Sequence, residues 1–575
     1  MDERLYLNGA LMDLPKRAVS RTLQINDFRE IKDRQANYSN NVKLPKTSNN
    51  IKVLSNLGFN GSTSRLPYEK ISVKYVLNGI ELISNGKAVI RNTTDFYNLV
   101  IYDGNIDMIS LLGFETLEDL DFSNYNHDLS FTTFLDFQSN TYDDGFIYPL
   151  RGEVQSTVSN TIPCFYVGKL FEEIFTQKGW TITGDIFSDS NYKSRVTTMD
   201  IGFEQDIVFR EIPKYVNQTN NTYTGSSVTP VTITLDTINI DETGSYELEI
   251  LGDFDIRFGS FILNIVKNGT KIIELANASV RTIINDEYFL LFENGDTVTL
   301  ELVLVGEPYQ IIVSNSTVAK LNNSYYVIKF EDIIGNTKQI DFVKDVMQRF
   351  NLSFRRVRNK NEIEFITSEA LLSNTIDAVD WSNVFSRKIK ESYSSKYAKD
   401  NMFKYLYDET EEDYADGNLI INDFNLKPIT TLITSIFKAS KILKNAYFYE
   451  YWDEDNKPKQ DGLRLFKVNT ENKEIPLRLY PGTEYSNLTT NFKFLDFSEL
   501  DFDQEIVDNY SVFSSMLNDF KIIIVEINLD VIDIYNMNFF KLRYIKQLGR
   551  YFYVNKISNF KPNKPTKVEL IQIPI

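Results

Sequence analysis

Short runs of alternating apolar and polar residues dominate the pattern along this chain. From Ile71 to Tyr75 apolar side chains alternate with Ser and Lys, which is the period of a half-buried β-strand. Asn78-Gly79 and Asn85-Gly86 supply the positive-φ residues that two-residue hairpin turns need. The pattern therefore predicts a small N-terminal β domain over residues 1–110.

The polar stretch at 28–50 interrupts this β pattern. It carries no helical stripe, and long polar connections inside compact domains usually serve a function. We expect a long surface loop or an arm that reaches a neighbouring subunit.

Two segments show apolar residues at helical spacing. The first, 163–179, begins with Pro163 and ends with Gly179, residues that favour the start and the end of a helix. The second spans 339–350, and each runs directly into a strand-like segment. The repeated helix-then-strand unit suggests two related layers of one scaffold, in helix–strand domains formed by 111–215 together with 319–380.

Between these units, residues 216–318 are rich in Thr, Ser and Gly, with β patterns at intervals of roughly 8 to 12 residues. This spacing predicts an inserted β-sandwich or jelly roll. Residues 381–575 are again dense in β-branched and aromatic residues, and Gly549-Arg550 is a plausible turn. We expect a C-terminal β-rich domain there, a meander or a barrel, whereas 430–440 could be helix or strand. The fold class is mainly β with a few α-helices, α+β and multi-domain.

Composition supports that class and narrows the function. At 575 residues the chain is longer than one hydrophobic core usually serves. Its 41 Phe and 33 Tyr favour β-sheets. The net charge of −18 has the wrong sign for binding nucleic acid or an anionic membrane. No signal-peptide pattern and no run of 18 apolar residues is present, so we expect a soluble chain without a membrane anchor.

Residues for nucleophilic or zinc chemistry are scarce. The single cysteine, Cys164, stands beside Phe165 and Tyr166 and is expected to be a small buried hydrophobe. The single histidine, His127, lies in a polar segment, where we expect a surface or loop position. One Cys and one His cannot form a zinc site, and no glycine-flanked serine elbow is present.

Oxygen-ligand and phosphate sites are also not indicated. Asp453, Asp455 and Asp461 superficially resemble a calcium loop, but Lys457 and Pro458 break the EF-hand spacing, so we expect a solvated acidic hairpin tip. The glycines are scattered as turn residues and do not form a phosphate-binding cluster. We therefore predict no catalytic, cofactor-binding or metal site and no cofactor. A pair of carboxylates for glycoside cleavage remains an open alternative.

Positive charge gathers locally in two places, 32–46 and 355–362. Solvated hairpin loops are the simplest interpretation. The alternative is complementarity to an acidic face of the same or another subunit.

Three stretches resemble a known family. They are the opening (5–15, 22–54 and 67–90), the segment QIDFVKDVMQRFNLSF at 339–354, and the closing segment 539–573. All are similar to parts of the tail hub, or baseplate hub and adaptor, proteins of tailed phages and prophages of Bacteroidetes-type hosts. They cover about a quarter of the chain, from end to end.

The resemblance implies a non-enzymatic virion protein with hub-like β-barrel and helix–strand domains. Such a protein forms a cyclic homo-oligomer, a trimer or a hexamer, around the DNA channel, and is made in the host bacterial cytoplasm. Its expected partners are other tail proteins: upstream rings, and distal fibres, a needle or a muzzle. Genomic DNA would pass without specific binding, because an acidic lumen repels phosphates.

Two other functions stay open. A jelly-roll insert with surface Tyr and Trp could stack on sugars, which would make the chain a carbohydrate-binding receptor-recognition protein of the tail. A tail-associated glycan hydrolase is the other alternative.

Overall fold

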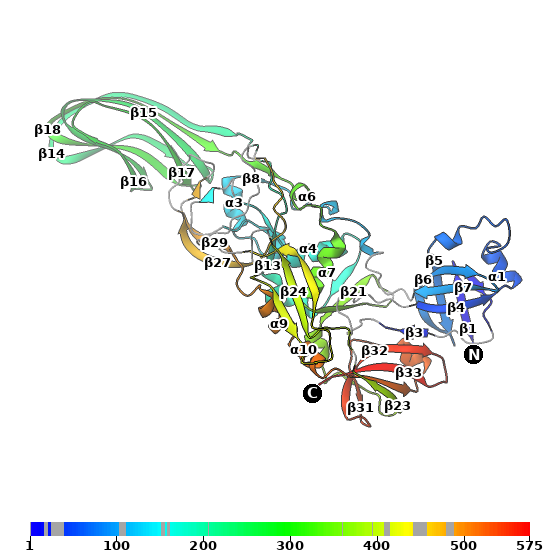
Figure 1. Cartoon of the computed structure of the whole chain (residues 1–575). Coiled ribbons are helices and arrows are strands. Elements are labelled where there is room, and N and C mark those ends of the chain that lie inside the picture. The colour runs from blue at the N-terminus through cyan, green and yellow to red at the C-terminus, as the bar shows by residue number, and fades with distance from the viewer. Residues whose placement is uncertain are drawn as a thin grey trace.

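The computed structural model describes residues 2–15, 21–24, 39–102, 111–150, 156–157, 161–204, 206, 208–358, 360–393, 395–407, 414–440, 457–475, 477–478 and 488–574. Within them the chain is an elongated assembly of β-sheets and short helices (Figure 1). A long sheet arm projects at one end, and the N-terminal and C-terminal sheets lie at the other. The mainly β, α+β class is confirmed. Every sheet among the described strands is open, so the prediction of a barrel is wrong for these residues.

The N-terminal sheet contains six strands in the order β2-β1-β5-β6-β7-β4. The alternation at 71–77 buries every second side chain, and Asn78-Gly79 forms the predicted hairpin turn with both φ angles positive. The second predicted turn is wrong, because Asn85-Gly86 lies inside β6. A Cβ on Gly86 would lie 2.6 Å from the Ile83 side chain, so glycine is needed there for close packing. The strands are β1 Glu3–Leu7, β2 Ala10–Met12, β4 Ser39–Pro45, β5 Ile71–Leu77, β6 Ile80–Thr93 and β7 Phe96–Tyr102.

The polar stretch expected to form a loop or arm is only partly described. Residues 28–38 lie outside the described residues. From Ser39 onward the expectation is wrong, because β4 pairs with β7 and buries Val42 and Leu44. Helix α1 (Ser48–Val53) follows, with Thr47 as its N-cap. Two apolar side chains among polar neighbours were too few to reveal this strand.

The C-terminal sheet follows the order β22-β31-β32-β33-β30-β23, and β3 adds to β32. The predicted turn at Gly549 is confirmed, with φ +63° between β31 and β32. This sheet and the N-terminal sheet share one hydrophobic core, in which Leu5 and Val73 join Phe552 and Leu570. The elements are β3 Arg21–Leu23, β22 Val379–Asp380, β23 Phe385–Ser392, β30 Ile522–Ile527, α11 Val531–Tyr535, β31 Arg543–Ile545, β32 Arg550–Phe560 and β33 Thr566–Gln572.

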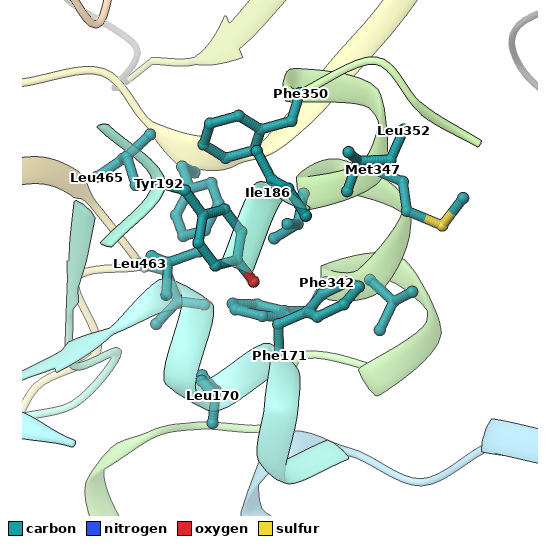
Figure 2. Close-up of a cluster of buried hydrophobic side chains, with 14 of the residues drawn as sticks. Leu170, Phe171, Ile186, Tyr192, Phe342, Met347, Phe350, Leu352, Leu463 and Leu465 are labelled. Carbon is teal, nitrogen blue, oxygen red and sulfur yellow. The ribbon is translucent and has the colours of Figure 1, made fainter. Parts of the chain in front are cut away.

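Both predicted helix-then-strand units are present in the central region. The predicted helix start at Pro163 is wrong, because Cys164–Tyr166 forms strand β11 and the helix begins at Val167. Helix α4 (Val167–Thr176) precedes β12 (Thr181–Thr183), and α7 (Gln339–Arg349) precedes β20 (Leu352–Arg356) and its hairpin partner β21 (Glu362–Thr367). The two units belong to one three-stranded sheet of order β12-β21-β20. Their helices bring Phe171 and Phe342 into one buried cluster (Figure 2).

The remaining central elements complete this core. The segment 430–440, of undecided type in the sequence, lies mostly in strand β26. The elements are η3 Leu117–Asp119, β8 His127–Leu129, α3 Phe131–Phe137, η4 Tyr142–Asp144, β9 Phe146–Ile147, β10 Ser156–Thr157, β11 Cys164–Tyr166, η6 Asp185–Ser188, α5 Ser190–Lys193, β13 Arg195–Thr198, β19 Tyr326–Ile328, α6 Phe330–Ile333, α8 Ser368–Ser373, β24 Asp400–Leu406, β25 Gly417–Ile420, β26 Ile429–Lys438, β27 Leu465–Ile475, β28 Leu477–Arg478, β29 Leu488–Asp496, α9 Phe502–Asn509 and α10 Ser511–Asn518, with η2 Leu66–Tyr68 in the N-terminal sheet region.

The projecting arm is formed by five strands that extend beyond 216–318 at both ends. Strand β18 lies between β14 and β15, and β15 pairs first with β17 and then with β16. The long strands fold over so that apolar side chains of both halves form one core. The strands are β14 Glu211–Asn239, β15 Gly244–Lys267, β16 Thr270–Ala278, β17 Thr282–Phe292 and β18 Thr297–Asn322.

Glycines stand where the long strands turn over. Gly259 and Gly306 have φ angles of +86° and +148°, which disfavour a side chain. A Cβ on Gly259 would lie 2.7 Å from the Val305 carbonyl oxygen, and one on Gly306 would lie 2.8 Å from the Gly259 Cα. Phe254 and Phe261 stack 5.1 Å apart across this corner. The corner thus converts one long ribbon into two packed layers.

Candidate functional site

His127 does not occupy the expected surface or loop position. It starts strand β8 and is half-buried among aromatic rings, stacked 4.7 Å from Phe146. Its Nδ1 lies 2.7 Å from the Tyr125 carbonyl oxygen and its Nε2 lies 2.7 Å from the Tyr148 hydroxyl. A neutral ring donates through Nδ1 and accepts through Nε2 in this arrangement. Burial lowers the pKa of His127, so the ring acts as a packing and hydrogen-bonding residue.

Cys164 is buried in β11, as its apolar neighbours predicted. The strand pairs with β9 on one side and β13 on the other. The thiol therefore belongs to the core of the central region.

The acidic segment with superficial likeness to a calcium loop is described only from residue 457 onward, so Asp453 and Asp455 lie outside the described residues. Asp461 is not at a solvated tip. Its carboxylate accepts a 2.8 Å hydrogen bond from Arg464 Nε, and its backbone N–H donates to the Asp200 carbonyl. This acid is part of the packed body.

The basic hairpin at 355–362 contacts other parts of the same chain. Arg355 pairs with Glu364 across the hairpin. Arg358 donates to the backbone carbonyls of Tyr535 at 2.9 Å and Leu82 at 3.1 Å, and stacks 4.2 Å from the Tyr535 ring. Arg358 is exposed, as a solvated hairpin loop predicts, and its guanidinium also joins this hairpin to strand β6 of the N-terminal sheet and to helix α11 of the C-terminal region. Residues 32–38 of the other basic stretch lie outside the described residues.

Beside this junction lies an open cavity of about 840 Å³. The N-terminal sheet contributes Lys74 and Lys87, and the hairpin contributes Arg356. No carboxylate is among its described lining residues, although Lys74 also pairs with Glu81 at 2.6 Å. Three cationic side chains thus gather around this recess.

A buried ionic network, which the sequence pattern did not reveal, holds the central region together. The Glu505 carboxylate of α9 accepts hydrogen bonds of 2.5 Å from Arg195 and 2.7 Å from Arg349. Arg349 also contacts Asp345, one helical turn away, and donates to the Tyr405 hydroxyl. All five side chains are almost fully buried.

The positions of the charged groups in this network offset the cost of burying them. Burial raises the pKa of Glu505, while the guanidinium groups of Arg349 and Arg195 oppose that rise. Charges taken out of water are tolerated only when they are paired and hydrogen-bonded. The network therefore serves as a structural joint between segments far apart in the sequence.

One acidic cluster on the arm meets the distance requirement of a metal site. Carboxylate oxygens of Glu247, Glu249 and Glu287 lie within 4.8 Å of one another. Lys320 forms ion pairs with this cluster: its ammonium lies 3.3 Å from the Glu247 carboxylate and contacts the Glu249 carboxylate. These contacts raise the pKa of Lys320. One cationic side chain of the chain itself thus already pairs with two of the three carboxylates.

A shallow trough of about 510 Å³ crosses the outer face of the arm. Its rim consists of amide, hydroxyl and carboxylate side chains with two exposed aliphatic ones. The trough runs across four neighbouring strands, along the row Asn220, Ser314, Asp253 and Ile283. It is a candidate surface for contact with a partner.

None of the helices in the described ranges is long and apolar enough to cross a bilayer.

Comparisons with known proteins give limited guidance. No protein-family profile and no curated protein sequence matches the chain. Among solved structures, infectious bursal disease virus Gx strain is 17% identical over 22% of this chain and 36% of that one, with a TM-score of 0.16. A CBM35 from Paenibacillus barcinonensis is 17% identical over 19% of this chain and 97% of that one, with a TM-score of 0.13.

A third solved structure matches along nearly the whole length. The 43 kDa tail protein of prophage MuSo2 from Shewanella oneidensis is 6% identical over 99% of this chain and 98% of that one, with a TM-score of 0.33. The chain spans less than half the length of the first viral proteins that it matches. At these TM-scores the likenesses establish no family for the chain.

Proposed function

We propose that this chain is a structural subunit of a phage tail, a hub or adaptor that forms a ring around the DNA channel. In this role it links upstream tail rings to distal components or fibres, resides in the virion and performs no bond-breaking of its own. Copies of the chain, as a trimer or hexamer, and other tail proteins are its partners.

The observation that carries the proposal is the meeting in space of the three hub-like sequence stretches. The opening stretch forms most of the N-terminal sheet, and the closing stretch, 539–573, forms three strands of the sheet that shares its core. The middle stretch forms α7 and β20, and Arg358 in the following hairpin donates to Leu82 of the opening stretch and to Tyr535 of helix α11, which shortly precedes the closing stretch. Segments separated by hundreds of residues thus belong to one connected body.

The build of the chain suits a linking role. The arm projects from one end, while the shared terminal core lies at the other (Figure 1). Head-to-tail contacts between subunits close into a ring when the rotation from one subunit to the next closes. A net charge of −18 also suits a channel wall, because like charge repels passing DNA phosphates.

Antibody labelling of intact particles tests the assignment. We expect an antibody against this chain to label the tail at one axial position, and mass spectrometry of purified particles to recover the chain at a fixed ratio to other tail proteins. Absence of the chain from washed particles would contradict the proposal.

Carbohydrate binding by the arm is the second candidate, and the polar trough favours it. Gln218, Asn220 and Asn285 present amides and Asp253 a carboxylate, groups that bond sugar hydroxyls. The Trp expected to provide stacking is missing, since the three Trp lie at 180, 381 and 452, outside the arm. Binding of the full chain to a glycan array, lost in Asn220→Ala and retained in Lys271→Ala, would favour this function.

A further inference from the structure

One layer of the arm, formed by residues 211–225, 310–322, 244–258 and 282–292, ends in two open edges. Its strand order is β14-β18-β15-β17, from the pairing of each neighbour. Among the described strands β14 pairs only with β18, and β17 only with β15. An edge strand leaves every second backbone N–H and C=O without a strand partner.

The β14 edge lacks the usual protection against pairing. From Tyr215 to Gly225 its register with β18 is uninterrupted, and no charged residue or proline occurs in this stretch. Natural proteins commonly place charges, prolines or bulges at edges that must stay single. In a chain of net charge −18, this neutral edge is where a second copy can approach with the least repulsion.

The β17 edge runs in the direction that antiparallel pairing with β14 of another copy requires. Because each neighbouring pair is antiparallel, β14 and β17 run in opposite directions. Copies placed side by side in the same orientation therefore bring β17 of one against β14 of the next as an antiparallel pair.

Exposed aliphatic side chains mark both edges. Val216 on β14 is 64% exposed and Ile283 on β17 is 71% exposed. Both point to the outer face of the sheet, the face of the trough. Single exposed aliphatics are common on a protein surface, and pairing of the two edges would partly cover both side chains.

We propose that β14 of one copy pairs with β17 of the next, so that the arms join into a continuous sheet. The interface rests on the proposed ring and names its contact surface. Continuing the rows of the sheet places Gln218 of one copy opposite Asn285 of the next, and Asn220 opposite Ile283. The contact is heterologous, and repeated pairing gives a ring where the rotation between neighbouring copies closes.

Engineered disulfides in the full-length chain test the pairing. Cys164, the single natural cysteine, is buried, so introduced cysteines on the arm are the reactive ones. We mix Asn220→Cys protein with Ile283→Cys protein under mild oxidation and expect a disulfide between copies. The matched control replaces Asn220→Cys by Ser314→Cys, which lies in the same row and on the same face but on the central strand β18, and should give no bond.

A charge pair at one position supplies the second measurement. Gln218→Glu places an acid opposite a strand that carries Asp286 and Glu287, so association should weaken about tenfold or more, whereas Gln218→Lys should retain it. Thermal unfolding should be equal for both variants, because the side chain is exposed.

The outcomes separate the two proposals. A ring in native mass spectrometry without the Asn220–Ile283 disulfide would overturn the β14–β17 pairing and leave the ring standing. Equal association of both Gln218 variants would also overturn the pairing. A chain that is monomeric at every concentration and absent from particles would overturn the proposed function itself.

Discussion

Single side chains decide how the central region is held. Glu505 bonds two arginines that the sequence places 310 and 156 positions away. No periodicity or motif links residues at such separations, so sequence reasoning could not find the network. It predicted Cys164 as a buried residue for a local reason, namely its apolar neighbours.

Removing the Glu505 charge should destabilise the chain strongly. Glu505→Gln leaves the buried Arg195 guanidinium without its counter-charge and leaves Arg349 with Asp345 alone, and breaking a buried pair costs about 3 to 5 kcal/mol. Denaturant unfolding of the full chain measures this loss. Glu526→Gln removes the partner of the exposed Arg387 and should leave the midpoint unchanged; equal effects would contradict the structural role of the network.

His127 should titrate below the usual range for histidine. Burial lowers the pKa of the ring, so the unfolded chain takes up the proton at a higher pH than the folded chain. The stability contributed by the neutral ring is complete above the unfolded pKa of about 6.5 and is lost as the pH falls below it. With one histidine in the chain, a ¹³C-labelled imidazole gives one NMR signal. A midpoint at or above the unfolded value would contradict the buried position.

Strands and helices show where local patterns suffice. The helices at 163–179 and 339–350, the hairpin at Asn78-Gly79 and the turn at Gly549 follow from spacing and turn chemistry. Asn85-Gly86 did not make a turn, because Gly86 lies inside β6, where a Cβ would lie 2.6 Å from the Ile83 side chain and 3.0 Å from the Tyr102 carbonyl oxygen of the neighbouring strand. The barrel was not formed by the described strands, since closure depends on pairing between distant strands, which local pattern does not determine.

The corner of the arm should depend on its glycines. Gly259→Ala adds a Cβ at a positive φ angle and 2.7 Å from the Val305 carbonyl, so we expect a loss of more than about 1 kcal/mol and faster hydrogen exchange in β15 and β18. Gly269→Ala, with φ +79° and no atom within 4 Å of the new Cβ, bears only the conformational cost. A larger loss of stability in Gly269→Ala than in Gly259→Ala would contradict the role of Gly259 in forming the corner.

At the scale of the complete chain, one side chain joins three parts. Arg358→Ala removes the bonds to the carbonyls of Leu82 and Tyr535, so hydrogen exchange in α11 and β6 should increase. Lys360→Ala, an exposed change on the same hairpin, is the control. If hydrogen exchange is unchanged in Arg358→Ala, the parts are held together by the core that the terminal sheets share and not by this side chain.

The most direct test of the account is an electron cryo-microscopy reconstruction of the particle that contains this chain. The account predicts copies of the chain in a closed ring around the tail channel, with acidic side chains toward the lumen and neighbouring tail proteins above and below. A particle without the chain, or a ring whose lumen is lined by basic side chains, would contradict it.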